Sequence, residues 1–240
     1  MLEFLKKLMI KKESKKSDLN SVHRILNTDI KKVPTSTEEE ILFGCGCFWG
    51  AEKCFWKLPG IVTTSVGYAG GIKNNPTYYE VCSGITGHAE VVRVVWDAKK
   101  IDISDLLKMF WECHNPTQKN RQGNDIGTQY RSTIYYKNSK HKKIILASKE
   151  GYQNELNKQK MGKIETEINI FNSYFIAESY HQQYLAVAGN RQYCSASPTN
   201  VKLGSFNGSN YKLNDEIWKN FNWSVEKCVL RSDNNPIKND

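Results

Sequence analysis

Residues 40–56, EILFGCGCFWGAEKCFW, contain the change of pattern on which the fold depends. Up to Cys45 every second side chain is apolar, and a period of two is typical of a strand with one buried face. From Cys47 onward apolar side chains recur at helical spacing until Pro59-Gly60 ends the segment. The strand face contains Ile41, Phe43 and Cys45, and the helix face contains Cys47, Ala51, Cys54, Phe55 and Leu58. We therefore predict a strand that ends at glycine and a helix that begins at the thiol of Cys47.

The chain has 240 residues, of which 39% are hydrophobic, so it can form a packed core. Its net charge of +9 is concentrated at the front, because residues 1–33 hold nine Lys and Arg against four Asp and Glu. The remaining +4 is spread over about two hundred positions without a basic stripe, which predicts no nucleic-acid binding. Lys6 and Lys7 interrupt the first apolar stretch, so we predict neither a secretory signal nor a membrane span.

The rest of the chain alternates between strand and helix patterns. Strand patterns cover residues 61–71, 88–97, 128–136 and 164–171, and helix patterns cover 77–81, 104–115, 139–160 and a last stretch that includes 177–185. This order predicts an α+β fold, a two-layer sandwich with a ferredoxin-like split βαβ core in which helices pack on a mixed sheet. A doubly wound parallel sheet is the alternative, and it is disfavoured where strands follow one another without a helix.

We predict three parts along the chain. A flexible, basic N-terminal extension covers residues 1–38, a catalytic domain covers 39–195, and a C-terminal extension covers 196–240. Seven cysteines without any C-x-x-C pair favour a reducing compartment over a disulfide framework or a zinc site. We therefore expect a cytoplasmic protein, with organellar targeting by the basic extension as the open alternative.

Cys47 is the candidate nucleophile. A thiol in the first turn of a helix lies beside free backbone N–H groups and the positive end of the helix dipole. Such a position lowers a thiol pKa from about 8.5 to roughly 3.5–7.5, so that thiolate is present at neutral pH. The alternative is a small buried hydrophobic side chain, as most free cysteines are. Glu52, the nearest carboxylate along the chain, is interpreted as a first-turn acid that stabilises the helix dipole.

Four motifs in register resemble the peptide methionine sulfoxide reductase A family. They are GCFWGAE from Gly46, GYAGG at 67–71, NPTYYEVCSGITGHAEVVRV from Asn75 and GNDIGTQYRSTIYY from Gly123. The resemblance covers roughly residues 40–195. It implies a thiol-dependent reductase of methionine S-sulfoxide, free or in proteins, that repairs oxidised proteins without a metal or a bound cofactor.

The resemblance also implies the roles of individual residues. Cys47 attacks the sulfoxide sulfur, while Phe48 and Trp49 form an apolar slot for the substrate methyl group. Glu90 donates a proton to the oxygen, with Tyr78 and Tyr130 as further hydrogen-bond donors and Asp125 orienting the loop or the tyrosines. We expect burial among aromatic rings to raise the pKa of Glu90 and to keep its carboxyl protonated.

A second cysteine is needed to complete the reaction. The resemblance implies that the attack converts Cys47 to a sulfenic acid. It also implies that this sulfenic acid condenses with Cys194, the resolving thiol, which lies on a mobile C-terminal segment. The glycine-rich setting of many family members is missing around Cys194. Thioredoxin, or dithiothreitol in the test tube, then restores the dithiol, and we expect a monomer. Cys228 is either a second recycling thiol or an ordinary free cysteine.

Two other classes of function remain open from the residues alone. Cys47 could pair with His88, His114 or His181 as in a cysteine hydrolase. The basic front end could instead belong to a module that binds nucleic acid or membranes. Cys45, Cys54 and Cys113 are interpreted as buried structural residues rather than metal ligands.

Overall fold

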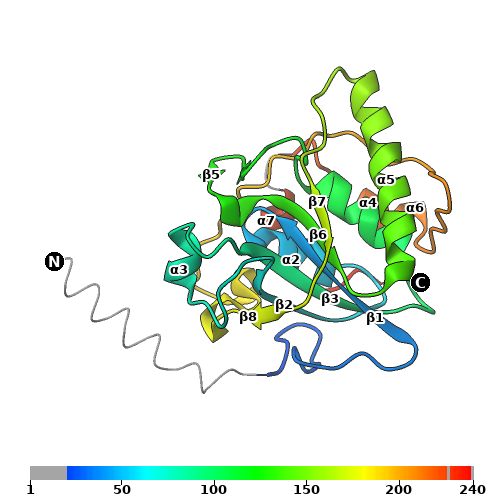
Figure 1. The fold of residues 1–240 in the computed structure, drawn as a ribbon. Coiled ribbons are helices and arrows are strands. Elements are labelled where there is room, and N and C mark those ends of the chain that lie inside the picture. The colour runs from blue at the N-terminus through cyan, green and yellow to red at the C-terminus, as the bar shows by residue number, and fades with distance from the viewer. Residues whose placement is uncertain (1–20, 226–227, 239–240) are drawn as a thin grey trace.

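The computed structural model describes residues 21–225 and 228–238, apart from the side chain of Cys228. Its centre is a six-stranded sheet in the order β7-β6-β1-β3-β2-β8 (Figure 1). Neighbouring strands are antiparallel except β6 and β7, which are parallel, so the sheet is mixed. The strands are β1 (Glu38–Cys45), β2 (Ile61–Ala69), β3 (Ala89–Asp97), β6 (Ser132–Tyr136), β7 (Glu167–Ile170) and β8 (Tyr174–Ile176), and β4 (Arg121–Gln122) pairs separately with β5 (Asp125–Ile126).

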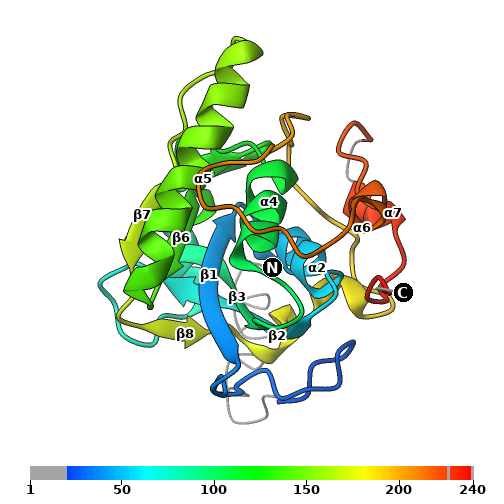
Figure 2. The same ribbon diagram turned by 90° about the vertical axis from the view of Figure 1, so that its right-hand side faces the viewer.

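The four inner strands have the predicted ferredoxin-like topology. Along the chain they follow the order β1-α2-β2-β3-α4-β6, with the short α3 between β2 and β3, and in the sheet they lie as β6-β1-β3-β2. The long helices cover one face of the sheet (Figure 2). The helices are α2 (Phe48–Trp56), α3 (Tyr78–Cys82), α4 (Ile103–Cys113), α5 (Ser139–Lys158), α6 (Asp215–Lys219) and α7 (Cys228–Arg231), with 3-10 turns at Thr128–Tyr130, Ser179–His181 and Tyr184–Ala186. The predicted α+β sandwich is confirmed.

The alternation seen in the sequence of β1 separates the two faces of the sheet. Ile41, Phe43 and Cys45 join the main core under the helices, whereas Leu42 belongs to a small cluster on the opposite face. The Phe43 ring stacks against Phe55 of α2 at 4.8 Å between centroids and against a ring of α4 at 5.1 Å. Burial of such rings contributes about 2–3 kcal/mol each, which fixes β1 and α2 relative to each other.

The helix expected around residues 177–185 does not form. The chain makes only two short 3-10 turns there, because Gln183 has a left-handed backbone (φ 48°, ψ 42°) that an α-helix cannot contain. The Gln182 side chain instead bonds to the backbone, accepting from Val66 N–H at 2.9 Å and donating to Ala177 C=O at 3.0 Å. This prediction was wrong because tertiary hydrogen bonds replace the helical ones.

Both extensions contribute packed segments. The prediction of a flexible extension over 1–38 is wrong for residues 21–38, because His23 and Ile30 are fully buried, and residues 1–20 lie outside the described residues. In the C-terminal extension, residues 232–235 cover the end of α2, where Lys57 Nζ donates to Asn235 C=O at 2.9 Å. Lys53 and Trp56 donate to backbone carbonyls of the same segment. α2 is therefore held from the sheet side and from the C-terminus.

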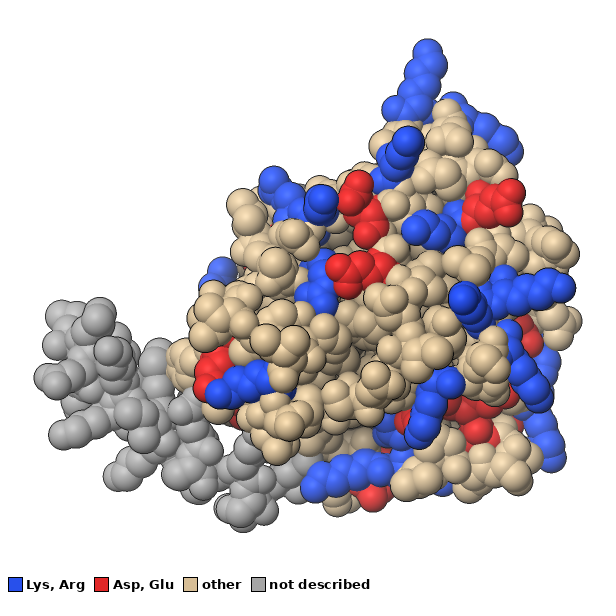
Figure 3. Space-filling model, in the orientation of Figure 1, with Lys and Arg blue, Asp and Glu red and all other residues tan. Residues whose placement is uncertain are grey.

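The charged side chains do not gather on the face of the molecule seen in Figure 3, where Lys and Arg alternate with Asp and Glu. This distribution agrees with the sequence, in which no basic stripe follows residue 33. None of the helices in the described part of the chain is both long and apolar enough to cross a membrane.

Candidate active site

The position of Cys47 results from the tight change from β1 to α2. Gly46 has φ 90°, which favours glycine, and a Cβ atom there would lie 2.5 Å from the Cβ atom of Gln122. Cys47 is the N-cap of α2 with a non-helical backbone (φ −53°, ψ 122°), and the helix begins at Phe48. The helix therefore begins one residue after Cys47, whereas we predicted that it begins at Cys47 itself.

The environment of the Cys47 thiol differs from the expectation. Burial raises the pKa of the Cys47 thiol well above its usual value, and the nearby carboxyl of Glu90 raises it further. A backbone hydrogen bond from Trp49 opposes the shift but is outweighed. The prediction of a lowered pKa was wrong because the side chain is only 9% exposed and loses its solvation. The resting protein thus holds a neutral thiol.

Glu90 lies beside this thiol. It is the second residue of β3, is 2% exposed, and its Oε2 accepts a hydrogen bond from Phe48 N–H at 3.0 Å. Burial raises the pKa of Glu90 to about 8, so the carboxyl is mostly protonated at neutral pH, as expected. A neutral carboxylic acid is thus held by the backbone next to the candidate nucleophile.

Aromatic rings form one wall of the site. The Phe48 side chain is buried and lies 6.0 Å from the Tyr68 ring, between ring centroids. Trp49 stacks face to face on Tyr184 at 3.7 Å, with 7° between the ring planes. Its Nε1–H donates to His181 Nδ1 at 3.1 Å, which fixes the rotation of the indole. The apolar wall is therefore preorganised.

The cleft between these groups has a volume of about 340 Å³, which is in the range of small-molecule sites. It is lined by Cys47, Phe48, Trp49, Tyr78, Glu90, Asp125, Tyr130, Tyr184, Arg191 and Tyr193. Every predicted site residue except Cys194 is among them. Burial raises the pKa of both Tyr78 and Tyr130, so these phenols stay protonated as hydrogen-bond donors.

Asp125 fixes the far side of the cleft. Its Oδ1 accepts a hydrogen bond from the Tyr193 hydroxyl at 2.5 Å, and the Tyr193 ring meets Trp49 edge to face at 6.4 Å. Tyr184, Arg191 and Tyr193 line the cleft but were not assigned to it from the sequence, and His181, which supports Trp49, was considered only as a hydrolase partner of Cys47. Their only local signal is a run of aromatic and histidine residues after the last predicted strand. Their role depends on contacts with α2, which no local pattern reveals.

Cys194 lies behind the cleft wall, against α2. A Cβ atom on Gly50 would lie only 2.5 Å from the Cys194 Sγ, so glycine leaves the space that the thiol occupies. Gly50 follows Cys47 by three residues, and Cys194 is one of the groups that raise the pKa of the Cys47 thiol. Cys194 is 3% exposed and borders a cavity of about 10 Å³, room for a single water, which Trp223 and Val229 also line. The thiol expected on a mobile segment is instead packed under the C-terminal extension.

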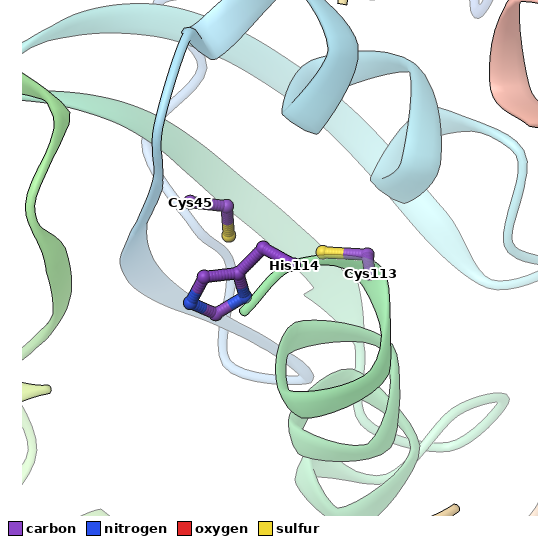
Figure 4. A group of neighbouring side chains, drawn as sticks. All are labelled: Cys45, Cys113 and His114. Atoms are coloured by element: carbon purple, nitrogen blue, oxygen red, sulfur yellow. The ribbon is translucent and has the colours of Figure 1, made fainter. Parts of the chain in front are cut away.

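Cys45, Cys113 and His114 form a buried group whose ligand atoms lie within 4.8 Å of one another (Figure 4). His114 Nδ1 lies 2.7 Å from Phe110 C=O and Nε2 lies 2.7 Å from the Ser132 hydroxyl. Burial lowers the pKa of His114 to about 4, so the ring is neutral, and Nδ1–H donates while Nε2 accepts. Neither nitrogen has a lone pair left for a metal ion, and the group is a hydrogen-bonded part of the core.

The histidines do not form the arrangement of a cysteine hydrolase. The His88 ring lies against Gly71 N–H and Lys73 C=O, and His181 accepts from Trp49. None of the three candidate imidazoles has a hydrogen bond to Cys47 in the regions that the structure describes.

Glu52 has a different environment from the one predicted. It is fully buried, and it accepts hydrogen bonds from the Thr64 hydroxyl at 3.0 Å and from the Gln183 backbone and side-chain amides at 2.8 and 2.7 Å. Burial raises the pKa of Glu52 to about 7. It therefore anchors the turn that precedes Tyr184, the residue stacked on Trp49, rather than stabilising the helix dipole.

We expect Glu52→Ala to lower the free energy of unfolding by about 3 kcal/mol, because it leaves three buried donors without an acceptor. Urea denaturation at pH 7 measures this change. Glu216→Ala, at an exposed glutamate of α6, is the matched control and should change stability by less than about 0.5 kcal/mol. Equal effects in both variants would contradict the anchoring role.

Comparisons with known proteins agree with this geometry. A family model described as "Peptide methionine sulfoxide reductase" matches residues 39–212, so the match begins with the predicted catalytic domain and continues beyond residue 195. The protein "Peptide methionine sulfoxide reductase MsrA" of Vibrio vulnificus is 53% identical over 75% of this chain and 86% of its own length. The protein of the same name from Rippkaea orientalis is 54% identical over 75% of this chain and 82% of its own length.

Solved structures show the same fold. "Methionine sulfoxide reductase A of Corynebacterium diphtheriae" superposes with a TM-score of 0.65 at 42% identity, covering 76% of this chain and 88% of its own. The reduced form of Mxr1 from Saccharomyces cerevisiae gives a TM-score of 0.61 at 33% identity, covering 68% and 92%.

Proposed function

The chain belongs to the peptide methionine sulfoxide reductase family, and on this basis we propose that it reduces methionine S-sulfoxide, free or in proteins, to methionine. One observation supports the proposal most directly. Cys47 and the protonated Glu90 line a single aromatic cleft and are linked through the amide of Phe48. Reduction of a sulfoxide by a thiol needs this pair, a sulfur nucleophile and an acid that protonates the departing oxygen.

The first step transfers oxygen from the substrate to the enzyme. The substrate methyl group lies against Phe48 and Trp49, and the S=O group points to Glu90, with Tyr78 and Tyr130 as additional donors. The Cys47 sulfur attacks the sulfoxide sulfur while Glu90 protonates the oxygen. Two electrons pass to the substrate sulfur, the oxygen is transferred to Cys47 as a sulfenic acid, and methionine leaves as a thioether. The proton of the Cys47 thiol restores the acid form of Glu90.

The second step removes the oxygen as water. The Cys194 thiol attacks the Cys47 sulfenic acid, a sulfur–sulfur bond forms, and water is released. The packing of Cys194 against Gly50, one turn along α2 from Cys47, supports this pairing. A dithiol such as thioredoxin then exchanges with the disulfide. In the proposed cycle, thiols and sulfoxide account for every atom and electron, so no bound cofactor is needed. A reducing compartment such as the cytoplasm suits this chemistry, because it keeps the thiols reduced.

The two thiols can be distinguished by one turnover without reductant. We expect mass spectrometry to find a Cys47–Cys194 disulfide in the wild type. In Cys194→Ser we expect Cys47 to remain a sulfenic acid that dimedone traps, and turnover with thioredoxin to fall at least about 100-fold because the disulfide cannot form. Cys228→Ser is the control and should behave as the wild type. Unmodified Cys47 in all three proteins would refute the proposed function, and a Cys47–Cys228 disulfide in Cys194→Ser would assign resolution to Cys228 instead.

A further inference from the structure

One charged residue of the cleft has no part in the mechanism. Three of the residues that line the cleft are acidic or basic, namely Glu90, Asp125 and Arg191. Glu90 is mostly neutral at pH 7, and Asp125 accepts the hydrogen bond of the Tyr193 hydroxyl. Arg191 is therefore the one cation among the lining residues.

The structure holds Arg191 at the rim of the cleft. Its guanidinium carbon lies 5.1 Å from the centroid of the Tyr193 ring, within the range of a cation–π contact. Tyr193 is itself fixed by its bond to Asp125 and by the edge-to-face contact with Trp49. The Tyr193 ring thus lies between the Arg191 guanidinium and the Trp49 indole, against which we place the substrate methyl group.

The N–H groups of Arg191 are available to a ligand. Within residues 21–225 and 228–238, no carboxylate or carbonyl is hydrogen-bonded or ion-paired to its side chain, which is exposed. The two buried arginines differ, because Arg93 pairs with Glu40 and Arg131 pairs with Glu167. A guanidinium presents two parallel N–H donors that match the two oxygens of a carboxylate.

We propose that Arg191 is a carboxylate-binding subsite that makes the protein prefer methionine sulfoxide with a carboxylate close by. The proposal rests on the proposed function. With the sulfoxide enclosed between Trp49 and Glu90, the substrate α-carbon lies three bonds from the sulfur, toward the rim where Arg191 stands. The carboxylate comes either from the α-carboxyl group of the methionine sulfoxide itself or from an acidic residue that follows it in a peptide.

Two pairs of substrates test the subsite and distinguish these sources. The first pair is N-acetylmethionine S-sulfoxide and its carboxamide, and the second is acetyl-methionine-S-sulfoxide-Asp-amide and the corresponding Asn peptide. We expect the wild type to have a kcat/KM about 5- to 20-fold higher for the acid in at least one pair at low salt, a preference that salt reduces. In Arg191→Gln the ratio should approach one, and Arg191→Lys should keep part of it because it retains the charge.

Arg231→Gln is the matched control, since it removes an exposed arginine of α7 that does not line the cleft. It should keep both the activity and the preference of the wild type. A preference in the first pair alone identifies the α-carboxyl group, and one in the second pair identifies an acidic neighbour. Equal rates for acid and amide in both pairs, or a preference that Arg191→Gln retains, would overturn the subsite.

Binding of the product separates this proposal from the proposed function. The dissociation constants of N-acetylmethionine and acetyl-methionine-Asp-amide, each compared with its uncharged amide, can be measured for the wild type and Arg191→Gln without turnover. Absence of turnover on all four sulfoxides would refute the reductase function. Tighter binding of an acid that Arg191→Gln removes would still support the subsite, and equal binding of acids and amides would contradict it.

Discussion

Glu90→Gln is expected to lower kcat/KM for methionine S-sulfoxide by about 10²- to 10⁴-fold, the usual contribution of a general acid. The amide keeps the oxygen that accepts the Phe48 N–H bond, so the cleft should retain its shape. It cannot deliver a proton to the departing oxygen. In the wild type kcat/KM should fall as pH rises through about 8, because Glu90 then loses the proton that it must donate. Steady-state rates from pH 6 to 9.5 with excess dithiothreitol test this profile.

The same substitution should stabilise the fold at neutral and alkaline pH. Glu90 has a folded-state pKa of about 8 against 4.5 for the free group, so the unfolded chain releases its proton first as pH rises. Wild-type stability therefore declines relative to Glu90→Gln between about pH 4.5 and 8, by at most about 5 kcal/mol for a shift of this size. Urea denaturation of both proteins at pH 5 and pH 8 measures the difference. A stability difference between the two proteins that stays the same from pH 5 to pH 8 would mean that the pKa of Glu90 is not raised by folding, and Glu90 could then not be the acid.

The prediction of the fold succeeded where local pattern and burial agree. The alternation of Ile41, Leu42 and Phe43 assigned each side chain to the correct face of β1, because strand periodicity is set by backbone geometry alone. The prediction of a helix around residues 177–185 failed because distant residues, rather than local pattern, decide the conformation there. This conformation is fixed by long-range hydrogen bonds, in which Gln182 accepts from Val66 N–H and Gln183 N–H donates to Glu52, and helical spacing cannot indicate such bonds.

The site shows the same division. Family resemblance placed Glu90 and Asp125, which the structure brings to one cleft although they come from different strands. It did not reveal Tyr193, whose place depends on Asp125, or Tyr184, whose place depends on Trp49. The ionisation of Cys47 was also beyond the sequence, since a thiol pKa depends on everything that excludes water from it.

Cys47→Ser should abolish turnover, with a loss of about 10⁴-fold or more, because a neutral hydroxyl is a far weaker nucleophile toward sulfur. Thermal melting should stay close to that of the wild type, since the substitution exchanges only sulfur for oxygen at a position without a capping hydrogen bond. Cys228→Ser, the control variant of the single-turnover experiment, serves here too and should keep most of the activity. Turnover retained in Cys47→Ser would exclude Cys47 as the nucleophile.

The raised pKa of the Cys47 thiol can be tested by alkylation. Alkylation of Cys47 by iodoacetamide in the resting enzyme should be slow at pH 7, and its rate should still be rising at a pH where an ordinary thiol is fully ionised, because only thiolate reacts. Peptide mapping of the alkylated wild type, with Cys47→Ser as the blank, gives this rate for the single site. Rapid alkylation at pH 7 would show that a thiolate already exists in the free enzyme. A rate that keeps rising above the pKa of an ordinary thiol would instead place thiol ionisation after substrate binding, when Glu90 has given its proton to the substrate oxygen and its carboxylate can accept the proton of Cys47.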